Sequence, residues 1–255
     1  REANSALALD SESSEALIAR GMAWLAHRWD WNKAREDLTR ALELSPNFSQ
    51  AHWAMSLYES VVDPSAGLDA ALQALSLDPL SLPITHAVAM RFYSLGNLEE
   101  AKKTAERMVD LDPDFAPAHW VLGLVHTFDG RYDAAIEELT LSVEQSGGVP
   151  STMAALAYAY AKSGDTIQAL ELLEQLKGRG ELLQGGHVPA LQIAYVYEGL
   201  GRTEDALDWL DRAFELRDPW LIHLNGFPRF ESLRKEKRFQ SLLRRLKLPE
   251  GTERS

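Results

Sequence analysis

A pattern of 34 residues is written twice without a gap between residues 82 and 149, and it constrains this chain more than any other feature. Three pairs of small residues repeat at this spacing: Ala89 and Gly123, Gly96 and Gly130, and Ala101 and Ala135. Self-similarity at a fixed period of about 20 to 50 residues is typical of repeat proteins, in which each unit buries one face against its neighbour. The sequence therefore predicts an array of stacked units instead of one globular core.

The composition predicts that these units are helical. Leu and Ala dominate the apolar residues, β-branched runs are short, and hydrophobic residues make up 45% of the chain, enough for a continuous core. Asn97, followed three residues later by Glu100, predicts a capping box at one helix start. Proline closes several units, because it lacks the N–H that a continuing helix needs. We expect an all-α fold.

Residues 13–220 resemble tetratricopeptide repeats (TPRs), in which each unit of about 34 residues is a pair of antiparallel helices. The resemblance implies a right-handed superhelix of about six helix pairs. We expect residues 1–12 to be the second helix of a preceding repeat and the chain to be a fragment of a longer protein. The repeats are expected near residues 13–47, 48–81, 82–115, 116–149, 150–186 and 187–220.

Three places depart from the regular spacing. The turn at residues 27–31 is about one residue longer than the repeat standard. Gly67 stands where the second helix normally has Ala, so we expect a shifted or looser helix start there. Residues 177–186 are rich in glycine and lengthen the connection to the last repeat, which predicts a flexible inter-repeat loop.

Residues 221–255 are expected to cap the array. Apolar residues between 221 and 248 recur at helical spacing, with basic residues between them, which predicts one basic amphipathic helix covering the last repeat. From residue 228 to 255 there are nine Lys and Arg against four Asp and Glu. Such a segment can also lie on a membrane surface or bind acidic groups, but the open face of the last repeat is the nearer partner.

The sequence carries no sign of catalysis or of a cofactor. It contains no GxxxxGK[ST] loop, HExxH helix or GxSxG elbow, so we expect no enzyme activity. His119 and His126 are seven residues apart on one helix, roughly 10 Å along its axis, which is too far for a shared metal ion. The net charge of −12 disfavours nucleic-acid binding. There is no Cys and no run of 18 apolar residues, so we expect a cytoplasmic protein without a membrane segment.

Three stretches narrow the resemblance to one bacterial group. These are residues 29–31 (Trp-Asp-Trp), 158–164 and 228–239. In that group TPR arrays follow a winged-helix regulator, a Ser/Thr kinase or a nucleotide cyclase. The resemblance implies a non-catalytic scaffold or regulatory module of a larger bacterial signalling protein.

The concave groove is the candidate site, because in TPR arrays the first helix of each repeat lines it. The expected partner-binding residues are His52, His86, Tyr93, Trp120, Phe128, Tyr158, Lys162 and Tyr195. His52 and His86 are taken as equivalent positions of neighbouring repeats. The tyrosines and Trp120 are expected to be exposed, since amphipathic aromatics anchor protein interfaces. The alternative is that they pack across repeats.

We expect the partner to be another protein or a peptide. The Lys/Asn clamp by which some TPR domains hold the C-terminal carboxylate of heat-shock chaperones is absent from the equivalent positions. Two other functions stay open from the sequence. One is self-association into a homodimer, and the other is a sensor that holds a small molecule or peptide in the groove.

Overall fold

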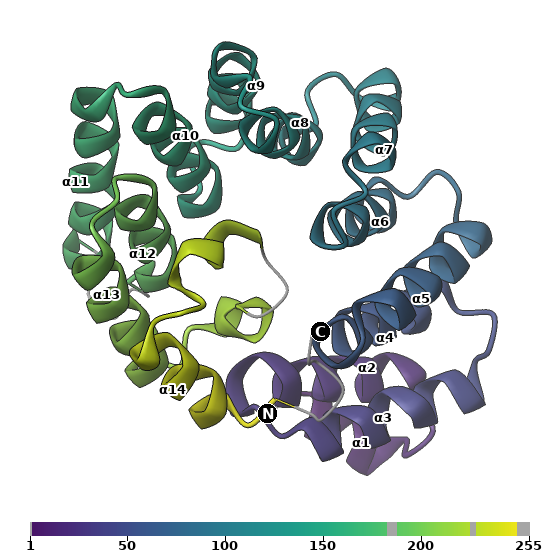
Figure 1. Cartoon of the computed structure of the whole chain (residues 1–255). Helices are drawn as coiled ribbons and strands as arrows, with labels where there is room; N and C mark the ends of the chain where they lie inside the picture. The colour runs from purple at the N-terminus through teal and green to yellow at the C-terminus, as the bar shows by residue number, and fades with distance from the viewer. Residues whose placement is uncertain (1, 183–187, 225–227, 249–255) are drawn as a thin grey trace. The chain divides into compact units, whose positions relative to one another are not determined.

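The computed structural model describes the backbone of residues 2–182, 188–224 and 228–248, and the side chains of these residues except 179–182 and 228–229. All regular structure within these ranges is helical, so the all-α prediction is confirmed (Figure 1). Contacts divide the chain into two units. Unit 1 comprises Arg1–Gly96, Ile222–Phe227 and Leu243–Ser255, and unit 2 comprises Asn97–Leu221 and Pro228–Leu242.

Unit 1 is built from stacked helix pairs. Its helices are α1 (Glu2–Leu9), α2 (Ser14–Ala23), a π-helix η1 (Trp24–Arg28), α3 (Trp31–Leu44), α4 (Ser49–Val62), α5 (Pro64–Leu77) and α6 (Leu82–Ser94). Helix α2 packs on α3, α4 packs on α5, and α5 packs on α6. The helices are closely packed, and the residues between them are small or fully buried. Ala34, Leu38 and Ala41 in α3 are examples.

The extra residue in the first repeat is absorbed by the π-helical turn. The backbone N–H of Trp29 donates to the carbonyl oxygen of Trp24, five residues earlier, and Asp30 N–H donates to the same oxygen at 3.2 Å. Trp29 then adopts a left-handed backbone with φ of 53°. A π-turn holds one residue more than an α-turn, so α3 can begin in its usual place.

In the second repeat, helices α4 and α5 pack more closely than we expected. Helix α5 begins at Pro64, three residues before Gly67, just as α7 (Leu98–Leu111) begins three residues before Ala101. Asp63 caps α5 by accepting the Ser65 N–H at 2.8 Å. A Cβ atom at Gly67 would lie 2.7 Å from the backbone of Ser60 in α4. The prediction of a shifted or looser helix start is therefore wrong: the two helices are in close contact at this glycine.

Unit 2 continues with α7 and the same arrangement of helix pairs. Its further helices are α8 (Ala116–Phe128), α9 (Tyr132–Gln145), α10 (Pro150–Ser163), α11 (Thr166–Leu182), α12 (Ala190–Gly199) and α13 (Thr203–Glu215). Each helix from α7 to α13 packs on the next one along the chain, and α10 also packs on α12. Asn97 is the N-cap of α7, but its side chain accepts no capping hydrogen bond, so the predicted capping box is not formed.

The glycine-rich connection is partly helical. Helix α11 continues through Gly178 to Leu182, so the prediction of a loop from residue 177 is wrong for this first part. The rest of the predicted loop, residues 183–186, lies outside the described residues.

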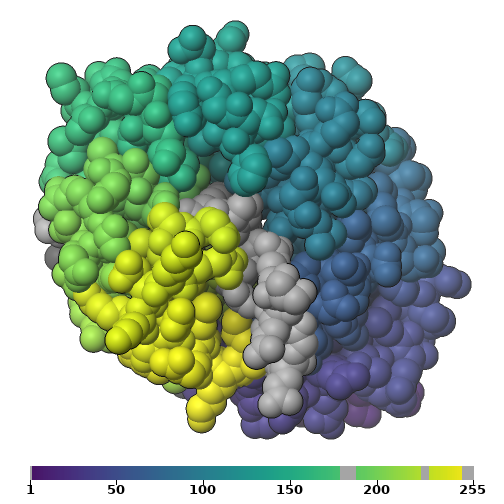
Figure 2. Space-filling view, viewed as in Figure 1, coloured from purple at the N-terminus to yellow at the C-terminus, as the bar shows by residue number. Residues whose placement is uncertain are grey.

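The C-terminal part is not one long helix. It forms two 3₁₀ helices, η2 (Pro219–His223) and η3 (Pro228–Leu233), and one α-helix, α14 (Lys237–Leu246). Within unit 2 we call residues 228–242 the C-terminal segment. Figure 2 shows this segment in yellow against the green last repeat. Phe230, Leu233 and Phe239 are almost completely buried.

Charged contacts attach the C-terminal segment to α13. The guanidinium of Arg238 donates to Asp208 and Asp211, both at 2.8 Å, and to Glu204 at 3.1 Å. These groups are exposed, so solvent and salt weaken their attraction. The buried aromatic and aliphatic side chains therefore carry most of the attachment, and Arg238 fixes the orientation.

Candidate partner-binding site

The histidines of two repeats show how the first helices align. His52 Nε2 lies 2.8 Å from the carbonyl oxygen of Pro46, and His119 Nε2 lies 2.9 Å from the carbonyl oxygen of Pro113. Both contacts span six residues. His52 therefore corresponds to His119, and the prediction that it corresponds to His86 is wrong.

The cause is the short turn of the second repeat, where only Asp63 separates α4 from α5. With this correction, Trp53 takes the place that Trp120 has in α8. Sequence reasoning on a strict spacing of 34 missed Trp53. The signal that reveals it is a shared pattern, Pro-x-Phe-x-x-x-His-Trp, which begins at Pro46 and again at Pro113.

The His119 side chain has a structural role. In addition to the Pro113 contact, its Nδ1 lies 2.7 Å from a carboxylate oxygen of Glu138 in α9. Both ring nitrogens thus face acceptors within the same helix pair. The imidazole joins the first turn of α8 to α9, and both of its nitrogens are used in these contacts.

Four aromatic rings of unit 2 form a continuous series. Tyr158 and Tyr195 stack with centroids 4.1 Å apart and an interplanar angle of 10°. Phe230 meets Tyr195 edge-on at 6.1 Å, and Phe239 follows at 6.3 Å from Phe230. The C-terminal segment therefore covers the predicted site residue Tyr195.

The predicted exposure of most aromatics is wrong. Tyr93, Trp120 and Tyr195 are only 3%, 7% and 4% exposed, and Tyr158 is partly buried. The Tyr158–Tyr195 stack joins α10 to α12, as the alternative of packing across repeats requires. Offset and stacked aromatic pairs stabilise by about 0.5–1.5 kcal/mol beyond their burial. The Tyr158–Tyr195 pair therefore helps to hold two neighbouring repeats together.

Two of the predicted residues remain accessible in unit 2. Phe128, at the end of α8, is 55% exposed, and Lys162, near the end of α10, is exposed. They stand at equivalent repeat positions. The Lys162 ammonium lies 5.8 Å from the centre of the Tyr158 ring, a cation–π distance. Phe128, Tyr158 and Lys162 together define what we call the α8–α10 surface.

The other predicted residues belong to unit 1. His52 on α4 is partly exposed and uses its Nε2 for the contact with Pro46. His86 and Tyr93 lie on α6. Desolvation, and secondarily the positive charge of Arg91, lowers the pKa of His86 to about 4. The same two causes lower the pKa of His223 to about 3.

These two imidazoles predict how stability depends on pH. An unfolded histidine has a pKa of about 6.5, so below this pH the unfolded chain binds more protons than the folded chain. The free energy of unfolding should therefore fall as the pH is lowered from about 6.5 to about 4. Urea unfolding across this range measures the effect. We expect His86→Gln to reduce the slope; an unchanged slope would contradict the assignment.

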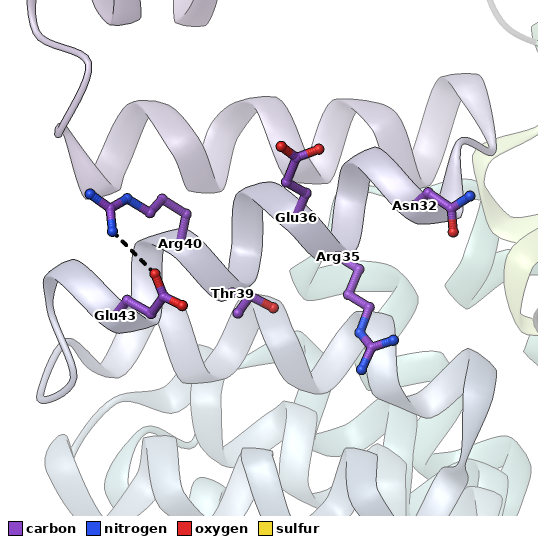
Figure 3. Close-up of a pocket in the computed structure, with 6 residues that line it drawn as sticks. All are labelled: Asn32, Arg35, Glu36, Thr39, Arg40 and Glu43. Carbon is purple, nitrogen blue, oxygen red and sulfur yellow. Dashed lines mark hydrogen bonds and ion pairs between the residues drawn. The ribbon is translucent and has the colours of Figure 1, made fainter.

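A separate depression lies on the surface of α3 (Figure 3). It measures about 600 Å³ and is lined by Asn32, Arg35, Glu36, Thr39, Arg40 and Glu43. All six residues come from one helix, and the Arg40 guanidinium donates to Glu43 at 3.1 Å. A hollow with walls from a single helix cannot enclose a ligand, so it is not a candidate site.

Two other kinds of feature are absent from the described ranges of the chain. No group of three or more His, Cys, Asp and Glu side chains there is arranged to hold a metal ion. No helix in the same ranges is long and apolar enough to cross a bilayer.

Family models identify the repeat. Residues 87–150 match a tetratricopeptide-repeat model, and residues 150–175 and 190–218 match two further models of this repeat. The chain thus contains TPRs, a repeat that generally mediates protein–protein interaction. No curated protein matches the chain.

Solved structures of TPR type resemble the chain. The APC/C hetero-tetramer Cut9–Hcn1 has a TM-score of 0.65 at 18% identity, covering 96% of this chain and 45% of that one. A thermophilic TPR protein of Thermus thermophilus gives 0.60 at 18% identity, with coverages of 80% and 98%. PilF of Pseudomonas aeruginosa gives 0.56 at 20% identity, with coverages of 89% and 99%. At these identities the likeness shows the fold alone, which is the all-α TPR superhelical type.

Proposed function

We propose that this TPR array is a non-catalytic scaffold that holds another protein or peptide, and that the α8–α10 surface of unit 2 is where the partner binds. The single observation that carries the proposal is Phe128, a large aromatic side chain that is 55% exposed at the end of α8. Exposed aromatic side chains are typical anchors of protein interfaces.

The chemistry of this surface suggests the kind of partner. Phe128 offers an apolar contact, the partly buried Tyr158 adds a second ring, and Lys162 supplies a positive charge. A partner segment with an apolar side chain near a carboxylate would match all three. The remaining predicted residues, His52, His86, Tyr93, Trp120 and Tyr195, are proposed to support the groove and not to meet the partner first.

We also propose that the array belongs to a larger protein. The resemblance of residues 29–31, 158–164 and 228–239 supports a place in a larger cytoplasmic bacterial signalling protein, where the array would bring a partner to an attached activity. Nothing in the three residues of the α8–α10 surface favours a homodimer or a ligand sensor over a protein partner.

The test compares proteins retained by immobilised wild-type chain and by variants. Phe128→Ala combined with Lys162→Glu should weaken binding at least tenfold, since interface anchors typically contribute about 2 kcal/mol or more. Circular dichroism should show an unchanged fold, because both side chains reach solvent.

Ile167→Ala is the matched control, because Ile167 is 70% exposed on α11 of the same unit but lies outside the α8–α10 surface. It should bind as the wild type does. If the double variant retained the same proteins with the same affinity, the partner would bind elsewhere and the proposed surface would be wrong.

A further inference from the structure

Arg91 occupies a repeat position that is apolar elsewhere in the array. It lies five residues before Gly96, the glycine with positive φ that follows α6. The equivalent residues, each five before such a glycine, are Val125, Ala159 and Val196. These three are at most 1% exposed. A charged side chain thus stands in repeat three where the other repeats bury an apolar one.

The guanidinium of Arg91 is buried without a counterion. Arg91 is 6% exposed, and its Nε makes no hydrogen bond. Within the described part of the chain, no carboxylate forms an ion pair with it. Desolvation lowers its pKa to about 10, with no carboxylate to offset the effect. Arg keeps its charge at neutral pH nevertheless, and burying an unpaired charge is unfavourable.

The positive charge of Arg91 acts on two imidazoles of unit 1. His86 lies on the same helix, and His223 is near enough for the Arg91 charge to lower its pKa. With pKa values of about 4 and about 3, both rings are neutral at pH 7. The cluster of Arg91, His86 and His223 therefore carries one positive charge at neutral pH.

We propose that Arg91 is the anchor of a binding site in unit 1 for a single carboxylate group. The planar guanidinium presents two parallel N–H groups that match the two oxygens of a carboxylate. One carboxylate would balance the single buried charge, whereas a phosphate dianion would leave a negative charge in the same surroundings. The site shares no residue with the α8–α10 surface of unit 2.

The carboxylate can belong to a small acid or to an acidic side chain of a peptide, and two probes distinguish these sources. The first is sodium acetate, compared with sodium chloride at equal ionic strength. The second is a short peptide with blocked ends and one Glu, compared with the same peptide carrying Gln. Thermal unfolding of the full chain at pH 7 should show a saturable stabilisation by the carboxylate member of at least one pair.

Arg91→Met is the decisive variant. It places an apolar side chain where the other repeats have one, so the chain should fold at least as stably as the wild type without a probe. Its apparent affinity for the stabilising probe should fall at least tenfold. Arg35→Met is the matched control, since it removes an exposed cation from α3 of the same unit, and it should respond as the wild type does.

Each outcome decides the question. Stabilisation by acetate alone would identify a small acid, and stabilisation by the Glu peptide alone would identify a peptide side chain. No carboxylate-specific stabilisation of the wild type, or an equal response in Arg91→Met, would overturn the proposal. If Arg91→Met did not fold, Arg91→Lys would replace it. That variant keeps the charge but loses the paired N–H groups, so its affinity for the probe should fall; an unchanged affinity would count against recognition by the guanidinium.

Discussion

Phe239→Asp is expected to destabilise the chain severely. Phe239 is fully buried in α14 and contacts Phe230, which in turn covers Tyr195 in the last repeat. Removing a buried aromatic side chain costs about 3–5 kcal/mol, and an unpaired carboxylate in its place adds to this cost. We expect a lower melting temperature and increased binding of a dye that detects apolar surface.

Lys237→Asp is the control for this substitution. Lys237 is exposed in the first turn of the same helix, so the change introduces the same carboxylate without removing a buried group. Its melting temperature should stay close to that of the wild type. If Phe239→Asp behaved in the same way, the C-terminal segment would not stabilise the last repeat, and the prediction of a capping segment would fail.

Gly67→Ala is expected to destabilise unit 1 by about 1–3 kcal/mol, the usual cost of forcing an extra methyl group into a packed interface. The new Cβ would lie 2.7 Å from the backbone of Ser60, which cannot rotate away as a side chain can. The helices α4 and α5 would have to separate. This cost opposes the gain of up to about 1 kcal/mol that alanine normally gives inside a helix.

Gly178→Ala measures the gain from alanine inside a helix without the cost of a close contact. Gly178 is also inside a helix, α11, and a Cβ there would meet nothing within 4 Å. We expect Gly178→Ala to raise the free energy of unfolding slightly and Gly67→Ala to lower it, in parallel urea titrations. A Gly67→Ala variant as stable as the wild type would show that the two helices adjust without cost.

The helical repeat was predictable because its signal is written many times. Small residues such as Gly123 and Ala135 recur at one spacing, and each fits where two helices meet; a Cβ on Gly123 would lie 2.3 Å from the Leu139 side chain. Because each close helix contact requires a small residue, small residues recur periodically in the sequence. A strict spacing of 34 takes no account of a turn that is one residue shorter, so it paired His52 with the wrong residue, although the pattern shared by Pro46–Trp53 and Pro113–Trp120 gives the correct alignment.

The exposure of the predicted partner-binding residues was harder to predict, because the residues around them come from distant parts of the chain. The pattern of α12 places Tyr195 on a lining position, but it does not reveal that Phe230 and Ser232 lie against that part of the helix. Ser232 donates a hydrogen bond to Glu198 at 2.6 Å, on the same helix as Tyr195. Phe128 and Lys162 kept access to solvent, because both stand near the ends of their helices.

The π-turn at Trp24–Arg28 has a consequence for how such a chain tolerates insertions and deletions. The first repeat holds one additional residue in its internal turn, and the second lacks one between α4 and α5, yet the connections at residues 45–48, 78–81, 112–115 and 146–149 all have four residues. Gains and losses of a single codon are thus accommodated inside a repeat, while these links between repeats keep their length. For protein engineering, the internal turns are the places to insert a label or a foreign loop, and the four-residue links are the places to leave untouched.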